Sequence, residues 1–91
     1  MYAALVHLTI EPSLASKAAQ AFSEILMPKI RTTPGFLEGH WVDPEDGNGF
    51  GFLLFESREA AEAGTPPNDD WTAPGVQFTS TKIRRVAASI P

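Results

Sequence analysis

The chain has 91 residues, of which 43% are hydrophobic and 20% are charged, and its formal net charge is -4. This composition is typical of a folded globular protein, and it excludes an intrinsically disordered chain. At this length we expect one small domain, covering residues 1–91.

The charges are distributed unevenly along the chain. All 11 acidic residues lie within residues 1–70, whereas Lys82, Arg84 and Arg85 follow without an acidic neighbour. These few bases on an acidic chain do not provide the positive surface that DNA or RNA requires. The sequence therefore predicts no nucleic-acid partner.

The sequence contains no cysteine, which excludes disulfides, thiolate metal ligands and cysteine nucleophiles. A reducing cytoplasm permits such a composition. The first residues, MYAALVHLTI, lack a basic leader, a long apolar stretch and a small-residue cleavage site, so neither export nor a membrane anchor is indicated. We expect a cytoplasmic protein without a membrane partner.

Residues 2–10 alternate in the manner of a β-strand. One face holds Ala4, Val6, Leu8 and Ile10, and the other holds Ala3, Leu5, His7 and Thr9. From about Ser13, apolar residues recur at steps of three and four and predict an amphipathic helix. Pro28 cannot donate a backbone hydrogen bond to Glu24, so we expect this helix to kink or end near Met27.

Residues 36–56 are predicted to form a β-hairpin. The first strand covers Phe36 to Asp43, the segment DPEDGNG forms a loop longer than a tight turn, and FGFLLFE forms the second strand. Ser57 can cap a short helix from Arg58 to about Ala63. Residues 65–75 hold three prolines and form a long loop, of the kind that is often functional or mobile, and Val76 to Ala88 is expected to close the sheet.

The predicted order of strand, helix, strand, strand, helix, strand is that of a ferredoxin-like α+β domain, with both helices on one face of an antiparallel sheet. The other face should then be polar in a monomer, but Leu5 and the third strand place apolar side chains on both faces. Leaving them in water costs about 1.5 to 3 kcal/mol each, against a total stability of roughly 5 to 15 kcal/mol. We therefore expect a homodimer that buries the open face.

Four segments carry a resemblance to a known family: MYAALVHLTIEPS, TTPGFLEGHW, LLFES and REAAEA. Together, over residues 2–63, they resemble the antibiotic-biosynthesis-monooxygenase-like family of the dimeric α+β barrel superfamily. The resemblance implies two sheets packed face to face in a homodimer, and a cleft for a small ligand between the sheet and the helices. Some members of that family oxidise aromatic polyketides or haem without a prosthetic group of their own, and others have no assigned reaction.

His40 and Trp41 are adjacent on a strand, so their side chains should point to opposite faces of the sheet. We expect Trp41 in the core and His40 at the cleft or the dimer face. Glu38 shares the face of His40 and could orient it, while His7 could reach the same space from the first strand. A third strand between the two histidines would hold them about 10 Å apart.

His7, His40 and Glu38 are thus the candidate catalytic residues, with the histidines acting as general bases. The alternative interpretation is that both histidines are only packed. The candidate ligand-binding residues are Leu5, Thr9, Phe52 and Trp71, and Trp71 could equally be a plug over the helical layer. The spacing of the histidines does not match a metal motif, and no glycine-rich phosphate loop follows a strand, so no metal or cofactor is predicted.

The leading functional hypothesis is a small dimeric protein that binds an apolar or aromatic metabolite, with a cofactor-independent monooxygenase reaction as one option. Known oxygenases of the family commonly have an asparagine on the first strand and a tryptophan at the end of the third, where this chain has Val6-His7 and Phe55-Glu56. Two alternatives therefore remain open. One is a non-catalytic ligand-binding or regulatory module, and the other is a cyclase or isomerase that uses the histidines as acid and base.

Overall fold

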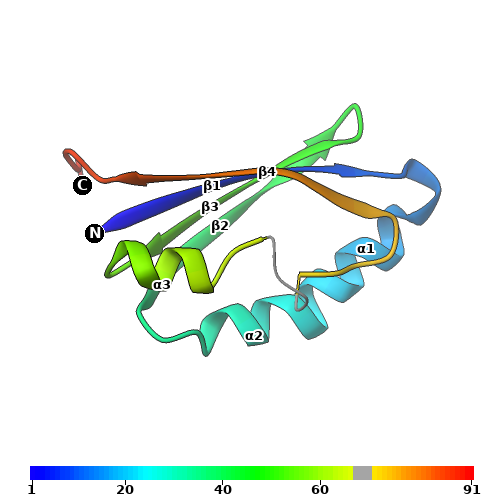
Figure 1. Ribbon diagram of the computed structural model, residues 1–91. Helices are drawn as coiled ribbons and strands as arrows, with labels where there is room; N and C mark the ends of the chain where they lie inside the picture. The colour runs from blue at the N-terminus through cyan, green and yellow to red at the C-terminus, as the bar shows by residue number, and fades with distance from the viewer. Residues whose placement is uncertain (67–70) are drawn as a thin grey trace.

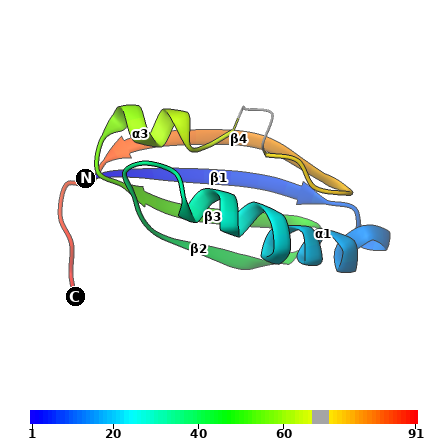
Figure 2. The same ribbon diagram turned by 90° about the horizontal axis from the view of Figure 1, so that it is seen from below.

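A computed structural model of the chain describes residues 1–66 and 71–91, and it contains a four-stranded antiparallel sheet in the order β2-β3-β1-β4. The strands are β1 (Tyr2–Ile10), β2 (Phe36–Glu45), β3 (Asn48–Phe55) and β4 (Val76–Arg85). The helical segments are η1 (Pro12–Leu14), α1 (Ala15–Ala21), η2 (Phe22–Leu26), α2 (Met27–Arg31) and α3 (Arg58–Ala63). All helices lie on one face of the sheet, as the ferredoxin-like prediction requires (Figures 1 and 2).

The core lies between the sheet and the helices. Ala4 and Val6 of β1 are fully buried there, as are Leu53 and Phe55 of β3. From the helices, Leu26, Ile30 and Ala61 complete this cluster. The alternation predicted for residues 2–10 is therefore confirmed, because the face with Val6 is the one beneath the helices.

Of the two outcomes predicted near Met27, a kink or an end, the helical region does not end there but continues past Pro28 with an irregular turn. It passes from α1 through η2, a π-helical turn, into α2, which ends at Arg31. In the π turn the Met27 N–H bonds to the carbonyl of Phe22, five residues earlier, instead of four. This wider turn accommodates the ring of Pro28, which would clash with a carbonyl in a regular α-helix.

The hairpin loop is shorter than predicted. β2 extends to Glu45 and pairs directly with Asn48, so that Asp46 and Gly47 alone form the turn. Both have positive φ angles, 52° and 75°, as a type I′ turn requires. An Asp-Gly pair favours this turn, and a register shift between Val42 and Glu45 takes up the remaining residues of the expected loop.

The other elements follow the prediction closely. The Ser57 hydroxyl accepts a hydrogen bond of 3.1 Å from the Ala60 N–H and caps α3. β4 ends at Arg85, three residues before the predicted end. Residues 67–70 of the predicted loop lie outside the described residues.

Gly51 creates the space that Trp41 occupies. The two residues are paired across β2 and β3, and the six-membered ring of the indole lies directly over the glycine. A Cβ atom at position 51 would lie only 2.5 Å from the Trp41 ring. The absence of a side chain on β3 therefore allows a large aromatic residue on β2 to lie flat against the sheet.

We expect Gly51→Ala to lower the free energy of unfolding by about 1 to 3 kcal/mol, because the added methyl group must displace the indole. In a Trp41→Leu background the same substitution should cost less, because the ring is gone. Denaturant unfolding of the four chains measures this coupling. If Gly51→Ala lowered the free energy of unfolding equally in both backgrounds, the indole of Trp41 would not be the reason for a glycine at position 51.

Candidate functional site

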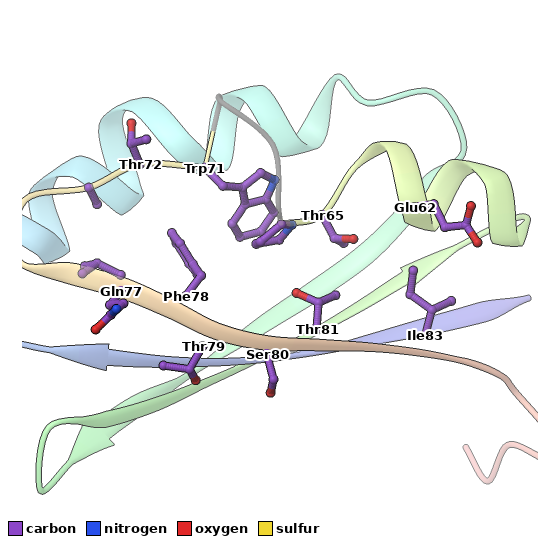
Figure 3. A pocket seen from close by; sticks show the side chains of 13 residues that line it. Glu62, Thr65, Trp71, Thr72, Gln77, Phe78, Thr79, Ser80, Thr81 and Ile83 are labelled. Atoms are coloured by element: carbon purple, nitrogen blue, oxygen red, sulfur yellow. The ribbon is translucent and has the colours of Figure 1, made fainter.

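A large cavity lies on the helix side of the sheet, between α3, residues 71–73 and β4, and we call it the helix-side pocket (Figure 3). Its volume is about 850 Å³. Its walls are mainly apolar and hydroxyl groups, including those of Trp71, Phe78, Ile83, Thr65 and Thr81. Glu62, an exposed residue, is the only ionisable residue that lines it among residues 1–66 and 71–91.

Trp71 forms the inner wall of this pocket, and its side chain is only 6% exposed. Its indole N–H donates a hydrogen bond of 3.1 Å to the carbonyl of Gly64. The ring packs edge-on against Phe78, with centroids 5.3 Å apart, and also contacts Trp41 at 5.7 Å. Of the two roles proposed for Trp71, the structure therefore favours a packed core residue that also presents a surface to the pocket.

An irregularity in β4 determines which of its side chains face the pocket. His7 pairs with Ser80 and Leu8 pairs with Phe78, so Thr79 is an extra residue in the strand. Phe78 and Thr81 point toward the helices, whereas Thr79 points to the other face of the sheet (Figure 3). The bulge thus directs an aromatic ring into the pocket and places a hydroxyl group beside His7.

Two smaller cavities lie on the β2 side of the helical layer. One, of about 280 Å³, is lined by residues that include Ala19, Phe22 and Trp41. The other, of about 470 Å³, lies between α2 and β2 and shares Met27 and Trp41 with the first. Phe22 of the π turn packs against Trp41, with ring centroids 4.9 Å apart, so aromatic residues separate these cavities from the helix-side pocket.

The predicted site residues lie on both faces of the sheet, and three of them, Leu5, His7 and Phe52, line one cavity of about 340 Å³ on the open face. His40 pairs with Phe52, and Phe52 pairs with Leu5, so these three form one row across the open face of the sheet. His7, Thr9 and Glu38 lie on the same open face, as the pairings of β1, β2 and β3 show. Trp71 lies on the opposite, helix-covered side. A cavity between the sheet and the helices therefore contains Trp71 but not the other predicted residues.

The two histidines have different surroundings. His7 is half-buried, its Nδ1 atom is hydrogen-bonded to the Thr79 hydroxyl, and its Nε2 atom lies 3.1 Å from Asn48 Oδ1. The Thr79 hydroxyl in turn donates to the His7 carbonyl. His40 is exposed on the edge strand β2, and β3 separates it from β1, as predicted. Both ring nitrogens of His7 are thus engaged in holding β1, β3 and β4 together.

Sequence reasoning missed Thr65, Phe78 and Thr81 as pocket residues. The weak alternation of residues 76–88 did not reveal the bulge, and without it the face of Phe78 cannot be assigned.

Among the residues that the structure describes, no three His, Cys, Asp or Glu side chains cluster as metal ligands. No helix within residues 1–66 or 71–91 is long and apolar enough to cross a membrane.

No protein-family model matches the sequence, and no curated protein matches it significantly. Among solved structures, the chain is similar to the crystal structure of a MhuD mutant with two manganese protoporphyrin IX molecules bound per active site. The TM-score is 0.71, the similarity covers 100% of this chain and 99% of that chain, and the sequence identity is 18%. This similarity confirms the predicted ferredoxin-like α+β fold of the chain.

The packing of Trp71 generates a test of its role. We expect Trp71→Ala to lower the free energy of unfolding by about 3 to 5 kcal/mol, because the indole contacts Trp41 and Phe78 in the core. Trp71→Phe should cost less, since it keeps a ring and loses mainly the hydrogen bond to Gly64. Chemical denaturation measures both. A loss below about 1 kcal/mol for Trp71→Ala would instead identify a mobile aromatic lid.

Proposed function

We propose that the chain binds a flat, apolar or aromatic small molecule in the helix-side pocket, and that it does so as a homodimer. The observation that carries this proposal is a pocket of about 850 Å³ with Trp71 and Phe78 in its wall and, among the described residues that line it, a single ionisable one. Small-molecule sites typically have about 300 to 1,000 Å³ and a mainly apolar lining with a few polar groups. The pocket has these properties.

The ligand class follows from the lining. An aromatic ligand can contact the parts of the Trp71 and Phe78 rings that line the pocket, and each such contact contributes about 0.5 to 1.5 kcal/mol beyond the burial of area. The hydroxyl groups of Thr72 and Thr81 can orient a ketone or phenol substituent. A porphyrin, the ligand in the similar structure, is itself large, flat and mostly apolar. That similarity supports an apolar ligand and leaves its identity to experiment.

The geometry favours binding over an oxidation, cyclisation or isomerisation that uses histidine. His7 and His40 lie on the open face, so neither side chain reaches a ligand in the helix-side pocket. A general base must lie within hydrogen-bonding distance of the proton that it removes. Among the lining residues that the structure describes, Glu62 is the only carboxylate that could accept a proton, and it is exposed to solvent. We therefore place ligand binding first and catalysis second.

Manganese protoporphyrin IX and an anthrone are suitable probes of the pocket. We expect at least one to bind, and we expect Thr81→Phe to weaken its binding at least about tenfold, because the added ring fills the pocket from β4. Ala19→Phe is the matched control, since it fills the smaller cavity on the β2 side and should change the Kd by less than about twofold. Quenching of tryptophan fluorescence measures both.

Two outcomes contradict the proposal. One is the absence of binding by either probe. The other is a Kd that responds to Ala19→Phe and not to Thr81→Phe, which would place the ligand in the cavity beside Phe22 and Trp41.

The homodimer is supported by the exposed apolar side chains of the open face. Leu5, Phe52, Phe50 and Val42 are 42%, 39%, 52% and 59% exposed, and they form two adjacent rows on neighbouring strands. Contiguous apolar patches of this kind mark interaction sites in soluble proteins. A second copy presents an identical patch, so a twofold interface buries both at once.

We expect Phe52→Lys to weaken the dimer by at least about a hundredfold, because a twofold interface loses two buried aromatic rings. Ile25→Lys is the control, since Ile25 is also apolar and 54% exposed but lies on the helical layer. Sedimentation equilibrium measures both constants. A wild-type chain that stays monomeric at micromolar concentration would contradict the homodimer.

A further inference from the structure

We infer that the second copy is oriented by charge: the acidic strand β2 of each copy lies beside the basic strand β4 of the other, with Glu38 opposite Arg84 of the second copy. This inference rests on the homodimer proposed above. It goes further, because it specifies which edges meet and in which register.

The two edge strands of the sheet carry opposite charges. β2 contains the acids Glu38, Asp43 and Glu45 and no lysine or arginine. β4 contains the bases Lys82, Arg84 and Arg85 and no acid. All six side chains are exposed, and the neutral strands β1 and β3 lie between them. The sheet therefore has a negative edge and a positive edge with apolar side chains between them.

Symmetry allows two orientations of a second, aligned sheet on the open face. The twofold axis must lie in the plane between the sheets, and it runs either along the strands or across them. An axis along the strands exchanges the two edges, so β2 of each copy lies beside β4 of the other. An axis across the strands keeps the edges on the same side, so β2 lies beside β2 and β4 beside β4.

The charges distinguish these two orientations. An axis across the strands would bring the acids of two β2 strands together, and likewise the bases of two β4 strands. An axis along the strands pairs unlike charges at both edges. Electrostatic complementarity of this kind fixes the orientation of an interface and disfavours the alternative. The apolar residues Leu5 and Phe52 remain at the centre in either case, as in interfaces with an apolar core and a polar rim.

The strand register identifies the pair that should form. Glu38 pairs with Leu54, Leu54 with Ala3, and Ala3 with Arg84, so Glu38 and Arg84 end the same row of the open face. A rotation about an axis parallel to the strands leaves each residue at its own level. Glu38 of one copy therefore meets Arg84 of the other, at both ends of the row. Arg84 uses one N–H within its own chain, toward the Ile83 carbonyl, and a guanidinium has five.

A charge-swap experiment tests the orientation. We expect Glu38→Arg and Arg84→Glu each to weaken the dimer about tenfold or more, because each change turns two symmetric attractions into repulsions. The double variant should restore the dimer to within about threefold of wild type, since it exchanges the two charges. Raising the salt from about 0.05 M to about 0.5 M should weaken the wild-type dimer. Sedimentation equilibrium without ligand measures all of these.

Controls separate this effect from misfolding and from net charge. Far-UV circular dichroism of each variant checks the fold, and Lys17→Glu and Glu24→Arg change the charge at exposed helical positions without altering the dimer. Three results would overturn the orientation. The first is that Glu38→Arg and Arg84→Glu both leave the dimer dissociation constant unchanged or lower it. The second is that the double variant dimerises no more tightly than either single variant, and the third is that salt strengthens the wild-type dimer. These measurements contain no ligand, so a failure of ligand binding does not affect them. A monomeric wild-type chain, by contrast, would contradict both the homodimer and its orientation.

Discussion

Both faces of the sheet carry apolar side chains, and the helices of the chain bury only one of these faces. The helices cover Ala4, Val6, Leu53 and Phe55, and leave Leu5 and Phe52 partly exposed on the opposite face. The cost of leaving large apolar side chains in water is a substantial fraction of the stability of a domain of this size. Burial of this face in the proposed homodimer would therefore add to the stability of the fold, and the opposite charges of the edge strands would favour one orientation of the two copies.

Aromatic packing on the covered face creates the pocket. Gly51 allows Trp41 to lie against the sheet, and Trp41 in turn contacts both Phe22 of the π turn and Trp71. Trp71 is additionally fixed by its hydrogen bond to Gly64. Because rigid rings and a backbone carbonyl hold this wall in place, the pocket exists before a ligand arrives, which reduces the entropic cost of binding.

The fold could be predicted from the sequence far better than the site. Periodicity predicted all four strands of the sheet. It also placed Val6 and Trp41 on the helix-covered face, because side chains alternate along a strand. Local exceptions were missed: a π turn carries the helix past Pro28, and an Asp46-Gly47 turn shortens the hairpin. The site depends on two further facts that alternation cannot supply. One is the bulge that redirects Phe78, and the other is the long-range contact that places Trp71 against Trp41.

The titratable side chains predicted to act in catalysis and the helix-side pocket lie on opposite faces of the sheet. His7, His40 and Glu38 lie on the face that assembly would cover, and the bonds from His7 to Thr79 and Asn48 tie three strands together. The pocket lies on the other face, with a nearly neutral lining. β4 is the element common to both faces, since Phe78 lines the pocket while its neighbour Thr79 bonds to His7. A ligand that shifts β4 would therefore act on the open face as well, and any differential affinity for the two arrangements would couple binding to assembly.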